Sequence, residues 1–246
     1  MSNESRFCHQ RGGTTLETQS LSKIYKVGAE DIHALCSVDF VAKQGDFVVV
    51  NGPSGSGKTT FLNLLSVIDR PTEGEVFVEG EPTSDKSEKQ LSVLRRSTIG
   101  LVFQTFNLVP VLSAAENVEY PLLLQQLPKE ERRSRVASML EEVGLEEMAK
   151  RRPNELSGGQ RQRVAVARAL VSGPRIVLAD EPTANLDSET GRRVMELLRR
   201  LNEEHCVTFL VVTHDPAVSA YAQRQIKILD GRLSEEASGV AVGSTS

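Results

Sequence analysis

The sequence predicts an α/β fold with a mostly parallel core sheet, a small antiparallel sheet and an inserted helical subdomain. Three short apolar runs rich in β-branched residues, 46–50, 175–179 and 208–212, are typical of central strands covered on both faces. Segments 34–40 and 75–79 alternate apolar and polar residues, as half-buried antiparallel strands do. Strand and helix patterns alternate after this β-rich opening, which favours a parallel sheet as the core.

Helical patterns separate the apolar runs along the chain. They cover Thr59–Ile68, Glu130–Glu142, Gly158–Val171 and Glu189–Glu204. A largely helical insertion at about 105–155 interrupts the alternation, and residues 225–233 form a predicted hairpin around Asp230-Gly231. We therefore expect one domain over 16–233, flanked by mobile tails at 1–15 and 234–246.

Composition excludes several classes of protein. The net charge is −4, aromatic residues make up 4% of the chain and Trp is absent, which disfavours a nucleic-acid-binding surface. Cys8, Cys36 and Cys206 lie far apart without a C-x-x-C pair, so we predict neither a zinc site nor a disulfide framework, in a reducing compartment. No apolar run approaches the roughly 20 residues of a membrane span, and the N-terminus has no apolar signal-peptide region.

The segment Gly52–Thr59, GPSGSGKT, matches the pattern G-x-x-x-x-G-K-[ST] between a predicted strand and a predicted helix. In that context its glycines let backbone N–H groups turn toward phosphates, and the helix N-terminus adds its positive end. We expect Lys58 to reach the β- and γ-phosphates of a nucleotide, the Thr59 hydroxyl to bind Mg²⁺ and Thr60 to reach the α-phosphate. The other expected nucleotide contacts are Gly52, Pro53, Ser54, Gly55, Ser56 and Gly57. A glycine-rich turn that matches the pattern by chance is the alternative, and the flanking strand and helix oppose it.

Polar side chains follow two of the predicted parallel strands. Asp180 and Glu181 end the run IVLADE, and His214 follows the next run in VVTHD. Ligands of open parallel sheets bind at this carboxyl edge. Asp180 suits a Mg²⁺ site, Glu181 a general base that activates water, and His214 a contact to the γ-phosphate. Gln104, which ends another apolar segment, is a further candidate for Mg²⁺ or the water. Helix capping by the acids and a structural histidine are the alternatives.

A second helix start also suits an anion. Ser157, a good N-cap residue, precedes Gly158, Gly159 and the predicted helix. One alternative is a well-capped helix with no ligand. However, the chain already has a phosphate loop, so the second helix start makes sense if its anion is bound to another subunit.

Together these motifs resemble the ATP-binding-cassette (ABC) ATPases, a family of P-loop NTPases. The resemblance rests on the phosphate loop, on LSGGQ at 156–160, on LADEPTANLD at 178–187 and on THD at 213–215, and it covers roughly 16–233. It implies ATP hydrolysis with Mg²⁺ in a head-to-tail dimer of two copies. Each ATP would then lie between the phosphate loop of one copy and the segment Ser157–Gln160 (Ser157, Gly158, Gly159, Gln160) of the other.

The resemblance also assigns individual roles. The residue matching Tyr25 stacks on adenine, the one matching Gln104 senses Mg²⁺ and the γ-phosphate, and the one matching Asp187 crosses to the partner copy. By the same comparison Glu181 is the catalytic base and His214 the γ-phosphate switch.

Within the family, residues 102–122 and 151–170 are similar to the group serving lipoprotein release, macrolide or peptide export and cell division. This similarity implies a separate integral membrane permease subunit, with the cassette at the cytoplasmic face of the membrane powering export or mechanical work. The expected docking residues are Phe106, Leu108, Leu112, Tyr120 and Pro121, unless they belong to the core. A cassette acting on DNA or ribosomes and a non-hydrolysing nucleotide-binding regulator are the alternative functions.

Overall fold

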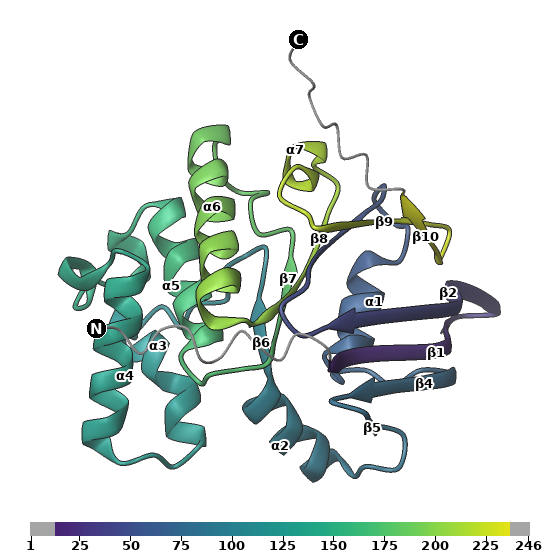
Figure 1. Cartoon of the computed structure of the whole chain (residues 1–246), viewed down its shortest axis with the longest axis horizontal. Coiled ribbons are helices and arrows are strands. Elements are labelled where there is room, and N and C mark those ends of the chain that lie inside the picture. The colour runs from purple at the N-terminus through teal and green to yellow at the C-terminus, as the bar shows by residue number, and fades with distance from the viewer. Residues whose placement is uncertain (1–12, 237–246) are drawn as a thin grey trace.

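The structure is a computed structural model that describes residues 13–236. Two sheets and a group of helices form layers, with the core sheet in the middle (Figure 1). The helices of the insertion lie on one side of this sheet, and α1 and the antiparallel sheet lie on the other. The predicted architecture of a core sheet, an antiparallel sheet and a helical insertion is confirmed.

The core sheet has six strands, five of which run parallel. In spatial order they are β10 (Arg232–Glu236), β9 (Arg224–Leu229), β3 (Phe47–Asn51), β8 (Thr208–Thr213), β7 (Ile176–Asp180) and β6 (Ile99–Val102). Strand β10 pairs antiparallel with β9 through the predicted hairpin, in which Asp230 (φ 47°) and Gly231 (φ 72°) both have positive φ. Because β3, β7 and β8 are parallel, their carboxyl ends lie at one edge of the sheet.

Both faces of the core sheet are buried, which explains its continuous apolar runs. On β3, Phe47 and Val49 belong to the core shared with the helices of the insertion. Val48 and Val50, which point to the opposite face, belong to the core shared with α1 and the antiparallel sheet. Because its side chains alternate between the two faces of the sheet, a single strand contributes residues to two separate hydrophobic cores.

The second sheet is antiparallel and has four strands in the order β2-β1-β4-β5. They are β1 (Thr14–Val27), β2 (Glu30–Lys43), β4 (Glu73–Val78) and β5 (Glu81–Pro82). The predicted strands 34–40 and 75–79 lie largely or wholly within β2 and β4, whereas β1 and β5 were not expected. Strand β1 has several register shifts against its neighbours, which break the regular alternation that reveals a strand in sequence.

Seven α-helices and two 3₁₀ turns complete the part of the chain that the structure describes. They are α1 (Lys58–Leu65), α2 (Glu88–Thr98), α3 (Ala114–Leu124), α4 (Lys129–Glu142), the turns Glu146–Met148 and Pro153–Glu155, α5 (Gly158–Leu170), α6 (Ser188–His205) and α7 (Pro216–Ser219). The four predicted helices correspond to α1, α4, α5 and α6. Helix α3, which was not predicted, contains Pro121 and begins at a capping box of Ser113 and Glu116.

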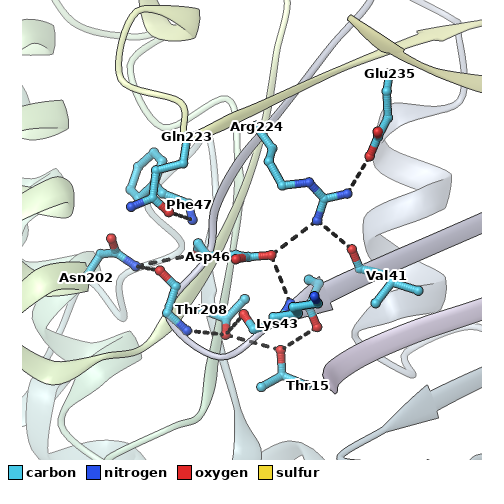
Figure 2. Close-up of polar contacts among 12 residues, drawn as sticks. Thr15, Val41, Lys43, Asp46, Phe47, Asn202, Thr208, Gln223, Arg224 and Glu235 are labelled. Atoms are coloured by element: carbon cyan, nitrogen blue, oxygen red, sulfur yellow. Dashed lines mark hydrogen bonds and ion pairs between the residues drawn. The ribbon is translucent and has the colours of Figure 1, made fainter. Parts of the chain in front are cut away.

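A cluster of polar contacts joins the amino end of β3 to the antiparallel sheet and to α6 (Figure 2). The buried Asn202 amide donates to the Val207 carbonyl (2.7 Å) and to the Gly45 carbonyl (3.0 Å). The Thr208 hydroxyl accepts a hydrogen bond from Thr15 (3.2 Å) of β1. The Asn202 bonds satisfy backbone carbonyls and the Thr15–Thr208 bond joins the two sheets, so together they help to set the position of β3 relative to its neighbours.

Three sequence-based expectations need correction or restriction. Residues 14–15 and 234–236 belong to β1 and β10 rather than to tails, and the remainder of both predicted tails lies outside the described residues. Cys36 is a free thiol, but Cys206 is disulfide-bonded, so the expectation of no disulfide is wrong for Cys206. Within residues 13–236, no helix has the length and apolar character that crossing a membrane requires.

Candidate functional site

The predicted polar residues meet at the carboxyl edge of the core sheet. The loop after β3, the end of β7 and the end of β8 surround one cavity of about 550 Å³. The residues lining it are Ile32, His33, Ala34, Ser54, Gly55, Gly57, Lys58, Thr59, Thr60, Gln104, Asp180, Glu181 and His214. Ten of these were predicted, whereas Ile32, His33 and Ala34 of β2 carried no signal in the sequence.

The loop Gly52–Thr59 has the backbone of a phosphate cradle. Gly57 has φ 104°, and a Cβ there would lie 2.5 Å from the Ala34 carbonyl oxygen. A Cβ on Gly52 would lie 2.3 Å from the Ile228 carbonyl oxygen, so both positions require glycine. The Ser56 hydroxyl is buried and has no hydrogen-bond partner among the described residues.

Lys58 is the first residue of α1, and its side chain is largely buried. Its ammonium group donates to the carbonyl oxygens of Gly52 (2.8 Å) and Pro53 (3.0 Å). The same nitrogen lies 3.9 Å from Oε1 of Glu181. An ammonium group held beside a glycine-rich loop at a helix N-terminus suits a polyphosphate chain.

Asp180 and Thr59 form the part of the site that suits a metal ion. The Thr59 hydroxyl donates to Oδ2 of Asp180 at 3.3 Å. Burial raises the pKa of Asp180, and the charge of Glu181 acts in the same direction, whereas Thr59 and Lys58 oppose the shift. A bound cation would stabilise the ionised form of Asp180, which burial disfavours. Oxygen donors are the ligands that Mg²⁺ prefers, and it takes its remaining ligands from water and substrate phosphates.

A complete metal site is not formed by the protein itself. Across residues 13–236 there is no group of three or more His, Cys, Asp or Glu side chains that could hold a metal ion. The donors Thr59 and Asp180 therefore fit Mg²⁺ delivered with a nucleotide rather than an independent metal centre.

Glu181 is the most constrained side chain of the site. It is buried, with a positive φ of 46°, which is unusual for a residue other than glycine. Its Oε2 accepts hydrogen bonds from the Thr213 hydroxyl (2.9 Å) and the His214 backbone N–H (3.3 Å). Its Oε1 lies 2.7 Å from Nδ1 of His214. The end of β8 thus orients the carboxylate that follows β7, and Thr213 is a neighbour of the predicted base that the sequence did not indicate.

The segment Ser157–Gln160 lies at a different cavity. Ser157 and Gln160 form a capping box, so the capping interpretation of Ser157 is confirmed. Ser157, Gly159 and Gln160 line a cavity of about 570 Å³ between α4, α5 and α6, which shares no lining residue with the phosphate-loop cavity. Ser157 is exposed and Gly158 is half-buried, which leaves them accessible. Their contact with an anion stays a prediction.

Gly159 has a structural reason to be glycine. A Cβ at this position would lie 2.4 Å from Cγ2 of Thr190 at the start of α6. Thr190 in turn donates its backbone N–H to Asp187, which caps α6 (2.9 Å). Gly159 therefore permits the close approach of α5 and α6.

Three further predicted residues lie in different surroundings. Gln104 lines the phosphate-loop cavity, and its carbonyl accepts a hydrogen bond from Asn185 (2.8 Å). Tyr25 does not line that cavity, and its hydroxyl donates to Asp69 (2.9 Å). Asp187 lines a separate cavity of about 360 Å³. Of these three residues, Gln104 lines the phosphate-loop cavity, whereas Tyr25 and Asp187 do not.

The predicted docking residues divide into two groups. Tyr120 and Pro121 line a cavity of about 320 Å³ between α2, α3 and α5. Leu108 packs against the hydrophobic core, and the Phe106 ring faces the guanidinium group of Arg161 at 5.3 Å. Leu112 is half-buried. Tyr120 and Pro121 thus line a cavity, whereas Leu108 packs against the core, and docking of a partner stays a prediction.

Comparison with known proteins identifies the family. The ABC transporter family model matches residues 35–184. The chain is 48% identical over 225 residues to the uncharacterized ABC transporter ATP-binding protein MJ0796 of Methanocaldococcus jannaschii, covering 90% of this chain and 96% of that protein. The chain belongs to the ABC transporter family.

Other ABC proteins match over the same region. The lipoprotein-releasing system ATP-binding protein LolD of Bordetella pertussis is 43% identical, over 90% of this chain and 96% of LolD. The macrolide export ATP-binding/permease protein MacB of Syntrophobacter fumaroxidans is 44% identical over 92% of this chain, which corresponds to 32% of MacB. A dimeric, post-hydrolysis structure of the MJ0796 cassette bound to ADP and Pi has a TM-score of 0.83, 48% identity, and coverage of 90% of this chain and 97% of that one.

The chain is thus an ABC ATPase domain, the ATP-binding and ATP-hydrolysing type of subunit, with ATP as substrate and Mg²⁺ as the expected cofactor. The predicted family, fold class and enzyme type are confirmed. None of these relatives supports a cassette that acts on DNA or ribosomes.

Proposed function

We propose that two copies of this chain bind two ATP molecules between them, each held by the phosphate loop of one copy and by Ser157–Gln160 of the other. The observation that supports this proposal most directly is the separation of the two sites. The exposed Ser157 lines a cavity that shares no residue with the phosphate-loop cavity of its own chain. The MJ0796 cassette, 48% identical, forms a dimer.

Within each site we assign distinct chemical roles. Lys58 and the loop N–H groups bind the β- and γ-phosphates, and Glu181 accepts a proton from the attacking water. Because Thr213 and the His214 N–H hold Oε2 of Glu181, the carboxylate keeps one orientation and Oε1 remains directed toward His214 and Lys58.

Metal binding and γ-phosphate contact involve the remaining residues of the cavity. Thr59, Asp180 and Gln104 would hold Mg²⁺, which when bound neutralises phosphate charge. His214 would contact the γ-phosphate through its exposed imidazole, whose Nδ1 already faces Glu181. This arrangement would make the base sensitive to the presence of the γ-phosphate.

The work done by hydrolysis would be transmitted to a separate membrane permease. LolD and MacB, which belong by name to lipoprotein release and macrolide export, support export or mechanical work as the outcome, at the cytoplasmic face of the membrane. The exposed side chains Tyr120, Leu123 and Leu124 of α3 form an apolar surface beside the cavity lined by Pro121. We assign this surface to permease docking.

Replacing Ser157 by Arg tests the shared site. The variant should bind ATP as the wild type does and lose hydrolysis, because the bulky cation would block the partner's γ-phosphate. Ser134→Arg, at an exposed position of α4, is the matched control and should hydrolyse normally. If Ser157→Arg loses ATP binding, Ser157 belongs to the ATP site of its own chain. If the variant hydrolyses ATP normally, Ser157 has no role in hydrolysis.

Complementation separates the two halves of the site. Ser157→Arg keeps an intact phosphate loop, and Lys58→Ala keeps an intact Ser157–Gln160 segment. A mixture of these two inactive proteins should therefore recover phosphate release, because each mixed dimer contains one complete site. A mixture that stays inactive, while each variant still dimerises, would contradict sites shared between copies.

A further inference from the structure

Beside the phosphate loop, Lys23 and Asp69 form an ion pair that fixes an aromatic ring. The Lys23 ammonium lies 2.8 Å from Oδ1 of Asp69, and it also donates to the Arg70 carbonyl (2.7 Å). The side chain of Lys23 is only 13% exposed, so the pair is shielded from solvent more than most surface ion pairs. Asp69 also accepts the Arg70 backbone N–H at 2.7 Å, which holds the carboxylate in place.

Tyr25 is held by both members of this pair. Its hydroxyl donates to Oδ2 of Asp69 at 2.9 Å, and the Lys23 ammonium lies 4.9 Å from the centre of its ring. Burial and then Asp69 raise the pKa of Tyr25, and the Thr60 hydroxyl, by hydrogen bonding, lowers it. Tyr25 pairs with Ile32 of β2 in the antiparallel sheet, and Ile32 lines the phosphate-loop cavity, so Tyr25 lies next to that cavity without lining it.

This arrangement restricts how Tyr25 can meet a base. The Lys23 ammonium occupies one face of the ring, so a base that stacks on Tyr25 would have to use the opposite face. The single O–H proton is donated to Asp69, so the phenol has no proton left to donate to a base. Tyr25 therefore offers a base its ring face and no donated hydrogen bond, and stacking on that face tolerates any base because every base has a π-face.

We propose that Lys23 and Asp69 are positioning residues of the adenine subsite, which fix the Tyr25 ring for stacking. This inference rests on the proposed role of Tyr25 in nucleotide binding. It predicts that the pair contributes to the affinity for ligands that carry a base and not to the affinity for phosphates alone. A pair that only stabilises the fold would affect both kinds of ligand equally.

Calorimetric titration with ADP and with pyrophosphate tests this distinction. In Lys23→Met and in Asp69→Asn, the dissociation constant for ADP should rise about three- to tenfold. The first change removes the cation from the ring face, and the second removes the charge that holds this cation in place. Pyrophosphate, which lacks a base, should bind each variant as it binds the wild type. Lys26→Met, at an exposed position of the same strand, is the control and should change neither constant.

Tyr25→Ala separates failure of this inference from failure of the proposed role of Tyr25. If Tyr25→Ala weakens ADP binding while Lys23→Met and Asp69→Asn do not, the positioning role is wrong and stacking by Tyr25 stands. If Tyr25→Ala leaves ADP binding unchanged, the assumed stacking is wrong. Equal losses for ADP and pyrophosphate in Lys23→Met and Asp69→Asn would mean a structural role and would overturn the inference.

Discussion

Replacing Glu181 by Gln removes one negative charge from the site and preserves the shape of the side chain. The Gln carbonyl can take the place of Oε2, where it would accept from the Thr213 hydroxyl (2.9 Å) and the His214 N–H (3.3 Å). The Gln amide would then occupy the place of Oε1, 2.7 Å from Nδ1 of His214, to which it can donate in one tautomer. We therefore expect a folded protein that still binds ATP.

The kinetic effect follows from the lost base. A positioned general base contributes roughly 10²- to 10⁴-fold to rate, so turnover should fall by that factor. This corresponds to about 3–5 kcal/mol of transition-state stabilisation. The Michaelis constant should change much less, because Lys58 and the loop Gly52–Thr59 retain their contacts to the phosphates.

Phosphate release and gel filtration together measure this prediction. Glu181→Gln should release phosphate slowly and, with ATP and Mg²⁺, should elute as a dimer that the wild type does not accumulate. Glu147→Gln, at an exposed position after α4, is the control and should match the wild type. Turnover within tenfold of the wild type would refute Glu181 as the base, and a monomeric variant that has bound ATP would refute the shared sites.

Two further predictions concern stability. Asn202→Ala removes the amide that donates to the half-buried Gly45 carbonyl and to the buried Val207 carbonyl, and should cost roughly 2–4 kcal/mol of stability. Urea unfolding measures this loss against Glu204→Ala, and a loss below about 0.5 kcal/mol would contradict the contribution of the bonds in Figure 2. Because burial raises the pKa of Asp180 above its unfolded value, this carboxyl stabilises the fold at low pH, and that contribution is lost as the pH rises through the folded pKa. Asp180→Asn should therefore raise the melting temperature of the nucleotide-free protein more at about pH 7.5 than at about pH 4.5, and equal shifts would contradict the burial argument.

The elements that sequence alone predicted are those whose signal is local. The loop Gly52–Thr59 is recognisable because its glycines, lysine and threonine act within one turn of backbone, between a strand and a helix that its flanks also encode. Helix α5 was predicted to within one residue, because Ser157 caps it and its apolar residues repeat along one face. Strand β1 was missed, because its register shifts leave no regular alternation and its pairing with β2 and β4 sustains it.

Tertiary structure decided how separated residues combine. The sequence predicted that Glu181 and His214 share one edge of the sheet, but only the fold shows Thr213 and His214 orienting the Glu181 carboxylate. It likewise pairs Tyr25 with Asp69, which lies 44 residues later, and places Gly159 against Thr190. The physical reason is the distance along the chain over which each kind of information acts. A pattern in sequence reports the backbone preference and burial of consecutive residues, whereas a hydrogen bond between distant side chains depends on strand register and helix packing to within a fraction of an ångström.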